Sequence, residues 1–471
     1  MSPQTRASLA ATYGVSERIA GYMIEQLLSG TEGLRSGGKY GNGFEWVVDT
    51  NIAREICLVM GAEEVAVSMR GNGSTSRARE EGPSGTPMKP ILTSSCPGWI
   101  CYAEKTHPYI LPYLSRLKSP QALMGTLMKT TLSRKLGISP NRIWHVAVMP
   151  CFDKKLEASR EEFTDIYWYG NSGFKSGVRD VDCVITSKEL LMLADARFID
   201  FAALARTKLS RRHLNPFPDP ILHDFLFPQS PRGKTNASPA AGTSGGNLYY
   251  ILQYFASQYE GSSIKTVRGR NADMIELTLV SSKGEPLLKA ARCYGFRNIQ
   301  NLVRRLRPTS VSRIPGSQPA GSAKKLDGKP NRVEYTYVEV MACPGGCTNG
   351  GGQIKIDDTI AGRRPTGAAK PGPREQKQWL AMVDEAYFSS DESETSEYSA
   401  PMNLDGPSDH VDGISPSYVK DTLAHWSAIT GIDLDRLVKT SYRAVVGSVG
   451  KDKGSDMKRV VELAGKVGGG W

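Results

Sequence analysis

The sequence lacks the features that mark membrane, secreted and disulfide-stabilised proteins. It contains no stretch of about 18 or more uncharged apolar residues, the length that a membrane-spanning helix requires. The first residues, from Met1 to Arg6, have no apolar core of the kind found in secretion signals. Only 8 of the 471 residues are cysteine, too few for a disulfide scaffold. We therefore expect a cytosolic or nuclear protein, in whose reducing surroundings clustered cysteines favour metal binding.

Signals for nucleotide hydrolysis and nucleic-acid binding are also missing. The run from Gly233 to Thr235 lacks the earlier glycine that a phosphate-binding loop requires. The formal net charge of +11 could attract nucleic acid, but the basic residues are spread along the chain. Short basic runs such as residues 211–213 are typical of solvated faces or helix ends. The sequence therefore predicts neither a phosphate loop nor a nucleic-acid partner.

The apolar pattern predicts an α/β fold with a sizeable core, for which a 39% hydrophobic content is adequate. Near-helical spacing in residues 4–30 and 47–60 indicates core-facing helices. Strand-like runs at 143–149 and 182–186 lead into Cys151 and into a helix near Ser187. Strands that alternate with helices indicate parallel sheets with covering helices, and ligand-bearing loops are then expected beyond the carboxyl ends of the strands.

Composition also divides the chain into three parts. The first is expected to be an α/β domain in residues 1–360, the second a partly acidic, low-complexity linker in 361–414 with a short helix near 376–387, and the third a helical segment in 415–471 that ends in Trp471. Within the first part, segments rich in loop residues predict disordered insertions near 69–88, 226–242 and 307–332.

Four cysteines stand in similar local surroundings. Cys343 and Cys347 enclose three residues and are followed by a glycine cluster, Cys96 precedes Pro97, and Cys151 follows Pro150. Glycine lets backbone amides approach sulfur closely, and four thiolates suit either an iron–sulfur cluster or zinc. Structural zinc sites usually combine two close pairs, whereas here only one close pair exists. The spacing therefore favours a cluster.

The remaining candidates have more ordinary explanations beside the functional one. Cys57, Cys183 and Cys293 are interpreted as small core residues, and Cys101 as a packed thiol, although it could be a spare ligand. Lys154 could donate a hydrogen bond to a cluster or to an anion on it. Glu157 and Arg160 could instead form ordinary helix-face pairs with the lysines. The glycine-rich turn 242–246 could bind an anion or simply cap a helix beside the cluster pocket.

Three blocks of the sequence together resemble a known family. Residues 93–99, 149–157 and 339–353 resemble the three signatures of iron-only hydrogenases, and residues 47–50, 118–121, 181–190 and 295–298 continue the resemblance. Hydrogenases carry cysteine where this chain has Ser95, and a serine hydroxyl cannot titrate near neutral pH as a thiol can. Phe152 and Asp153 also replace the small residues that border the di-iron pocket of that family. Hydrogenase activity, and any enzymatic role, is therefore not expected.

The version of the first block found here, residues 93–108, is similar to that of the eukaryotic Nar family, hydrogenase-like factors of cytosolic iron–sulfur protein assembly related to the prelamin A recognition factor. The resemblance implies a two-lobed α/β fold with a 4Fe-4S cluster in the cleft between the lobes. It implies the ligands Cys96, Cys151, Cys343 and Cys347, surrounded by Ser95, Met149, Lys154 and Met341. It further implies that the protein helps to transfer preassembled clusters to cytosolic and nuclear apoproteins.

The family's partners follow from the same resemblance. They are scaffold P-loop ATPases, apoprotein clients, and a targeting complex with a WD-repeat propeller, on which Trp471 is expected to dock. Members of the family also carry an amino-terminal segment with four further cysteines, and this chain begins after the place of that segment, so we expect one cluster here. Two alternatives remain: a redox enzyme of the hydrogenase type, and a prelamin-binding interaction protein with a structural cluster.

Overall fold

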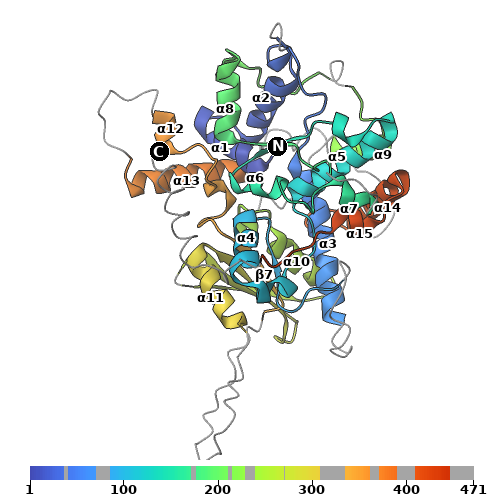
Figure 1. Cartoon of the computed structure of the whole chain (residues 1–471). Coiled ribbons are helices and arrows are strands. Elements are labelled where there is room, and N and C mark those ends of the chain that lie inside the picture. The colour runs from blue at the N-terminus through green and yellow to red at the C-terminus, as the bar shows by residue number, and fades with distance from the viewer. Residues whose placement is uncertain are drawn as a thin grey trace, which may run out of the picture.

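The computed structural model describes residues 1–36, 41–70, 85–170, 177–210, 215–228, 239–269, 271–307, 335–360, 371–389 and 409–445. In these residues the chain forms two halves, one around a two-stranded sheet and one around a five-stranded sheet (Figure 1). The helices are α1 (Pro3–Tyr13), α2 (Glu17–Ser29), α3 (Thr50–Arg70), α4 (Pro97–Thr106), α5 (Pro120–Leu136), α6 (Asp153–Ala158), α7 (Asp165–Tyr169), α8 (Ser187–Ala196), α9 (Pro220–Leu226), α10 (Asn247–Ala256), α11 (Phe296–Leu306), α12 (Ile356–Ile360), α13 (Pro373–Phe388), α14 (Pro416–Thr430) and α15 (Leu434–Val438).

The smaller sheet forms the upper half together with α1, α2 and α8. Its strands, β2 (Val146–Met149) and β3 (Cys183–Thr186), are parallel, with Val146 opposite Cys183 and Met149 opposite Thr186. Thr186 then caps α8, since its hydroxyl accepts from the Glu189 amide while the Glu189 side chain accepts from the Thr186 amide. This strand–helix order confirms the parallel arrangement predicted for these two runs.

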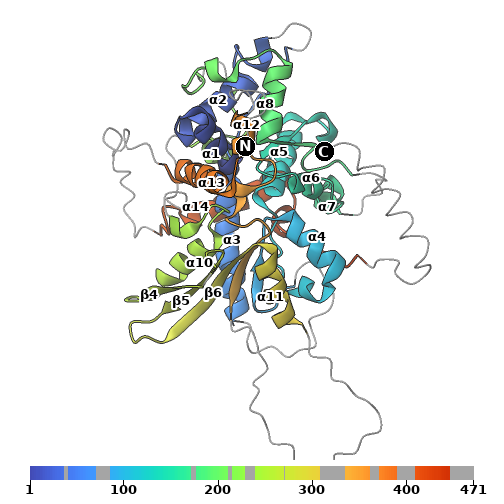
Figure 2. The same cartoon turned by 90° about the vertical axis from the view of Figure 1, so that its left-hand side faces the viewer.

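The larger sheet forms the lower half and has the strand order β1-β7-β6-β5-β4 (Figure 2). Its strands are β1 (Ile91–Thr93), β4 (Ser263–Arg268), β5 (Met274–Val280), β6 (Pro286–Tyr294) and β7 (Tyr337–Met341). β1, β7 and β6 are mutually parallel, as the predicted fold class requires, while β5 and β4 add an antiparallel edge. All five residues of β7 are buried. Its single charged residue, Glu339, accepts hydrogen bonds from the Leu248 amide (2.9 Å) and the Tyr294 hydroxyl (2.7 Å).

The expected segment boundaries differ from the observed ones at several places. Met69 and Arg70 complete α3, and Leu226 completes α9, so these residues are helical instead of belonging to insertions, while residues 71–84 and 229–238 lie outside the described residues. The short helix expected near 376–387 is observed as the longer α13, which packs on α1 and buries Val383 and Tyr387. These residues form helices because their apolar side chains recur with helical spacing, although the surrounding sequence is rich in loop residues. The segment predicted at 307–332 lies almost entirely outside the described residues.

Helix α14, in the C-terminal segment, packs against the rest of the molecule through its buried face. Trp426 is fully buried, and its indole nitrogen donates to the Thr130 hydroxyl of α5 at 3.0 Å. How the chain divides into independently folding units stays a prediction. None of the helices in the described residues is long and apolar enough to cross a lipid bilayer.

Asp219, the N-cap of α9, ties α5, α9 and α14 together. Its carboxylate accepts from the Leu222 amide (2.9 Å), the Lys135 ammonium (2.8 Å) and the His425 imidazole (3.0 Å). Burial raises the pKa of Asp219, but the bonds from Lys135, Leu222 and His425 outweigh it, and the pKa falls below the usual 3.8. The charged form is therefore the one that stabilises the fold.

We expect Asp219→Asn to lower the free energy of unfolding by about 1–3 kcal/mol at pH 7, the usual contribution of hydrogen bonds to a charged group. Since the folded pKa is depressed, this stabilisation is present above pH 3.8 and is lost as the pH falls through the folded value. Urea unfolding of both proteins at pH 7 and in steps down to pH 3 checks the effect. A difference that does not shrink on acidification would contradict it.

Candidate metal centre

Three of the four candidate cysteines follow the carboxyl end of a parallel strand within three residues. The fourth, Cys347, lies at the end of the loop that begins at Cys343. Cys96 follows β1 and is the N-cap of α4, and Cys343 follows the neighbouring strand β7. Cys151 follows β2 in the other half, and Cys347 starts a short 3₁₀ turn at the end of the Cys343 loop. The two sheets therefore present these thiols from opposite sides of the seam between the halves.

The structure brings all four thiols into one group. Every pair among Cys96, Cys151, Cys343 and Cys347 interacts electrostatically. Burial, together with the neighbouring thiols, raises the pKa of Cys151, Cys343 and Cys347 to about 12. Burial also raises the pKa of Cys96. None of the other four cysteines has one of these thiols among the charges that shift its pKa.

This donor set fits an iron–sulfur cluster better than a single metal ion. Four thiols that raise one another's pKa need bound cations before they can ionise, and metal coordination deprotonates a thiol. In the described part of the chain, no three His, Cys, Asp or Glu side chains converge closely enough to hold one ion. In a four-iron cluster each cysteine binds a different iron. The four cysteine sulfurs can therefore lie farther apart than four ligands around one metal ion.

The loop from Cys343 to Cys347 depends on glycine and on the turn before α10. Gly345 and Gly346 have φ angles of +75° and +98°, which favour glycine. The Ser244 hydroxyl accepts from the Cys347 amide at 3.0 Å, and a Cβ on Gly346 would come within 2.7 Å of that hydroxyl oxygen. Residues 242–246 thus lie beside the pocket, which agrees with the capping alternative for this turn.

The glycine cluster after Cys347 packs against the Cys151 loop. The Gly352 amide donates to the Pro150 carbonyl at 3.0 Å. A Cβ on Gly350 would lie 2.3 Å from that same oxygen, and one on Gly352 would lie 3.3 Å from the Cys151 Cα. Two ligand loops that are distant in sequence therefore touch through bare backbone.

Lys154 is buried behind the thiols and is held by a polar network. Its ammonium donates to Glu157 (2.9 Å) and to the Ser119 hydroxyl (3.2 Å), and Gln121 donates to the same Glu157 oxygen at 3.0 Å. Burial lowers the pKa of Lys154, but Glu157 and then Cys151 and Cys347 outweigh it, so the pKa ends above its usual value. The helix-face alternative is thus correct for Glu157. It is wrong for Arg160, which pairs with Glu104 instead.

Two further charged residues border the thiols: Lys355, which the sequence analysis missed, and Asp153, which it noted only as a departure from the hydrogenase pattern. Lys355 donates to the Asn349 side-chain oxygen at 2.9 Å, and its charge opposes the rise in the pKa of Cys343. Asp153 faces Gly98, where a Cβ would come within 2.6 Å of its carboxylate, and its charge raises the pKa of Cys96 and Cys343. No sequence pattern indicated Lys355, which follows Cys347 by eight residues.

The other predicted neighbours of the site differ in their placement. Ser95 is half-buried directly before Cys96, and Met341 belongs to the hydrophobic group around Cys96 and Cys347. Met149 belongs to a different group, with Ala147 and Ala158 among others. Trp471 lies outside the described residues. Cys57 and Cys293 are buried, as predicted for core residues, while Cys183 and Cys101 are half-buried.

The fold and the sequence both match one class of protein. A family model described as "iron only hydrogenase large subunit, C-terminal domain" matches residues 1–351. A solved FeFe-hydrogenase studied for oxygen inactivation of its H cluster aligns with a TM-score of 0.59 at 22% identity, covering 94% of this chain and 93% of that one. A FeFe-hydrogenase variant from Chlamydomonas reinhardtii aligns with a TM-score of 0.58 at 21% identity over the same shares. The chain thus has the iron-only hydrogenase fold.

Closer relatives define the branch within that class. The chain is 64% identical to the "cytosolic Fe-S cluster assembly factor NAR1" of Botryotinia fuckeliana, with all of this chain aligned to 79% of that protein. Proteins of the same name from Chaetomium globosum (60%) and Neurospora crassa (57%) also align with the whole chain, over 78% of their length. The chain belongs to the NAR1 family, as its first cysteine block predicted. The relatives' names say cytosolic and mention no nuclear location.

Proposed function

We propose that this chain carries one 4Fe-4S cluster on Cys96, Cys151, Cys343 and Cys347, and that it serves in cytosolic iron–sulfur protein assembly. The observation that supports this most directly is the mutual interaction of all four thiols, brought together from two sheets. The bound cluster supplies thiolate-held, redox-capable iron. The chain's own residues bury it, and Lys154 and Lys355 place positive charge beside the sulfurs.

The proposed role is to help pass preassembled clusters to cytosolic apoproteins, and the names of the relatives support the assembly pathway. Within that role, residues 1–360 form the hydrogenase-like cluster-binding unit, 361–414 a linker, and 415–471 a segment that presents Trp471. Scaffold P-loop ATPases and a targeting complex with a WD-repeat propeller are the proposed partners. These assignments rest on the family resemblance and on the chain's composition.

The proposed role is not catalytic. Ser95 offers a hydroxyl where proton transfer would need a group that titrates near neutral pH. The Lys154 ammonium is directed at Glu157 and Ser119 within a buried network, so two of its three protons already have protein acceptors. Hydrogen uptake by the purified chain, or carbon monoxide and cyanide vibrational bands in its infrared spectrum, would contradict this part of the proposal.

We expect the chain purified without oxygen to contain about four iron atoms and a matching amount of acid-labile sulfide, the content of one 4Fe-4S cluster. The double variant Cys151→Ser/Cys347→Ser should lose both, together with the electron paramagnetic resonance signal of the reduced protein, because a serine hydroxyl does not replace a thiolate ligand. Cys101→Ser is the matched control. Cys101 lies on α4 close to Cys96 but outside the thiol group, so its loss should leave the iron unchanged.

Two results would overturn the proposal. Zinc in place of iron would make the four cysteines a structural metal site. Equal iron in the wild type and in the double variant would show that these residues are not the ligands.

A further inference from the structure

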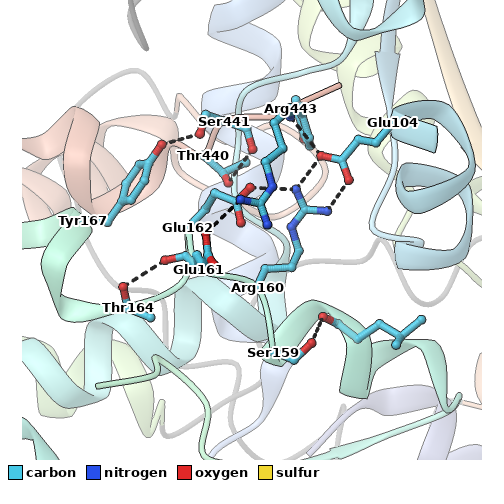
Figure 3. Close-up of polar contacts among 12 residues, drawn as sticks. Glu104, Ser159, Arg160, Glu161, Glu162, Thr164, Tyr167, Thr440, Ser441 and Arg443 are labelled. Atoms are coloured by element: carbon cyan, nitrogen blue, oxygen red, sulfur yellow. Dashed lines mark hydrogen bonds and ion pairs between the residues drawn. The ribbon is translucent and has the colours of Figure 1, made fainter. Parts of the chain in front are cut away.

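A short C-terminal segment, residues 439–445, crosses the seam between the two halves of the molecule; we call it the strap. On one side, the Thr440 amide donates to the Arg116 carbonyl at 2.7 Å, and the Tyr442 hydroxyl donates to the Ser115 carbonyl at 2.8 Å. On the other side, Ser441 meets the Tyr167 hydroxyl of α7 (Figure 3). The Tyr442 ring packs against the hydrophobic group that contains Cys96. The strap therefore contacts both halves beside the thiol site.

Glu104 connects the strap to the thiol site through hydrogen bonds. Its carboxylate is almost fully buried, with 4% of the residue exposed, and it takes both arms of the Arg160 guanidinium, at 2.9 and 2.7 Å. The oxygen that forms the 2.7 Å bond also accepts from the Arg443 backbone amide at 3.1 Å. The Val445 amide adds a bond to the Glu104 carbonyl at 3.0 Å. Figure 3 shows the Glu104 carboxylate facing the Arg160 guanidinium, while the Arg443 side chain points toward Glu161.

The Glu104–Arg160 pair connects two of the cysteine-bearing elements. Glu104 lies on α4, whose N-cap is Cys96, and Arg160 follows α6, which begins two residues after Cys151. A two-armed arginine–carboxylate bond fixes orientation as well as distance. Burial lowers the pKa of Arg160, but Glu104 and Glu162 outweigh it and raise the pKa, so the Arg160 guanidinium stays charged. The relative position of Cys96 and Cys151 is thus fixed partly through this pair.

We propose that Glu104 is a positioning residue that couples the strap to the cysteine site, so that displacing the strap lets α4 and α6 separate and loosens the cluster. The inference rests on the proposed cluster site. The Arg443 amide completes the hydrogen bonds of the Glu104 carboxylate, and the strap covers the seam that the Glu104–Arg160 pair closes.

The test compares two substitutions at one position. Arg443→Ala removes the exposed ion pair with Glu161 but keeps the backbone amide, whereas Arg443→Pro removes the amide as well. With cluster-loaded full-length protein, we expect the proline variant to release iron to a colorimetric chelator roughly tenfold faster than the alanine variant, since one hydrogen bond to a buried charge is lost. Glu104→Gln should release iron faster in the same way, whereas the alanine variant should match the wild type.

A second measurement needs no cluster and separates this inference from the proposed function. In metal-free protein, iodoacetamide should alkylate Cys96 and Cys151 faster in Arg443→Pro than in Arg443→Ala, while Cys293, buried in β6, should react equally slowly in both and so report that the fold is intact. If no variant binds iron, the proposed function fails and the alkylation rates still decide the coupling. Equal iron release and equal alkylation in the two Arg443 variants would overturn the coupling alone.

Discussion

Replacing Lys154 by methionine is expected to lower the free energy of unfolding by about 3–5 kcal/mol, the usual result of leaving one partner of a buried ion pair alone. Glu157 is buried with it and has its other contacts in Ser119 and Gln121, none of which carries a positive charge. Methionine fills much of the same volume, so the loss comes from the uncompensated carboxylate rather than from a cavity. Urea unfolding at pH 7 measures the effect.

The neighbouring residue provides the matched control. Lys155 is exposed and pairs with Glu189 at the surface, so Lys155→Met should change stability by less than about 1 kcal/mol. The double variant Lys154→Met/Glu157→Gln removes both charges and should recover much of the loss. If the double variant recovers stability but still binds less iron than the wild type, Lys154 affects the cluster independently of its ion pair with Glu157. A Lys154→Met protein as stable as Lys155→Met would contradict the structure of this network.

Gly350→Ala is expected to separate two of the cysteine loops. The added Cβ would lie 2.3 Å from the Pro150 carbonyl oxygen and 3.1 Å from that of Cys347, and neither backbone oxygen can rotate away. The Cys151 loop must therefore shift, which should lower stability by about 1–3 kcal/mol, as overpacking does. It should also reduce the iron retained after purification, because the shift moves Pro150 and Cys151 together.

Gly351 serves as the control for this change. A Cβ there would have the Phe152 ring at 3.6 Å as its nearest neighbour, an ordinary contact. Gly351→Ala should therefore keep wild-type stability and iron content, measured by urea unfolding and by iron analysis of anaerobically purified protein. If Gly350→Ala and Gly351→Ala behave alike, the close contact between the two ligand loops is not present in solution.

Local signals explain which parts of the site could be predicted from the sequence. Cys151 was expected beyond a strand because residues 143–149 are apolar and end at a proline, and β2 ends at Met149 as that pattern requires. The glycines near Cys343 and Cys347 were expected to let the backbone approach sulfur closely, and Gly345 and Gly346 adopt positive φ angles that favour glycine. That these cysteines bind a cluster stays a prediction. The antiparallel strands β4 and β5 were not predicted, because they carry no motif.

The contacts that no sequence pattern could reveal are the long-range ones. Glu104 and Arg160 are separated by 56 positions, and Glu104 and Arg443 by 339. An ion pair between residues that far apart leaves no periodicity or spacing in the chain. Arg160 was accordingly assigned to neighbouring lysines, since pairs three or four positions apart are the only ones that a helix pattern suggests.

The sequence by itself determined several of the elements, the family and the four candidate ligands, because hydrophobic period, glycine, proline and thiol chemistry act within a few residues of where they occur. Only the tertiary structure decided how these parts meet. It placed four thiols from two sheets in one group, directed Lys154 at Glu157, and positioned the strap across the seam against Glu104. Such contacts depend on which surfaces the packed core brings together, and distance along the chain carries no information about them.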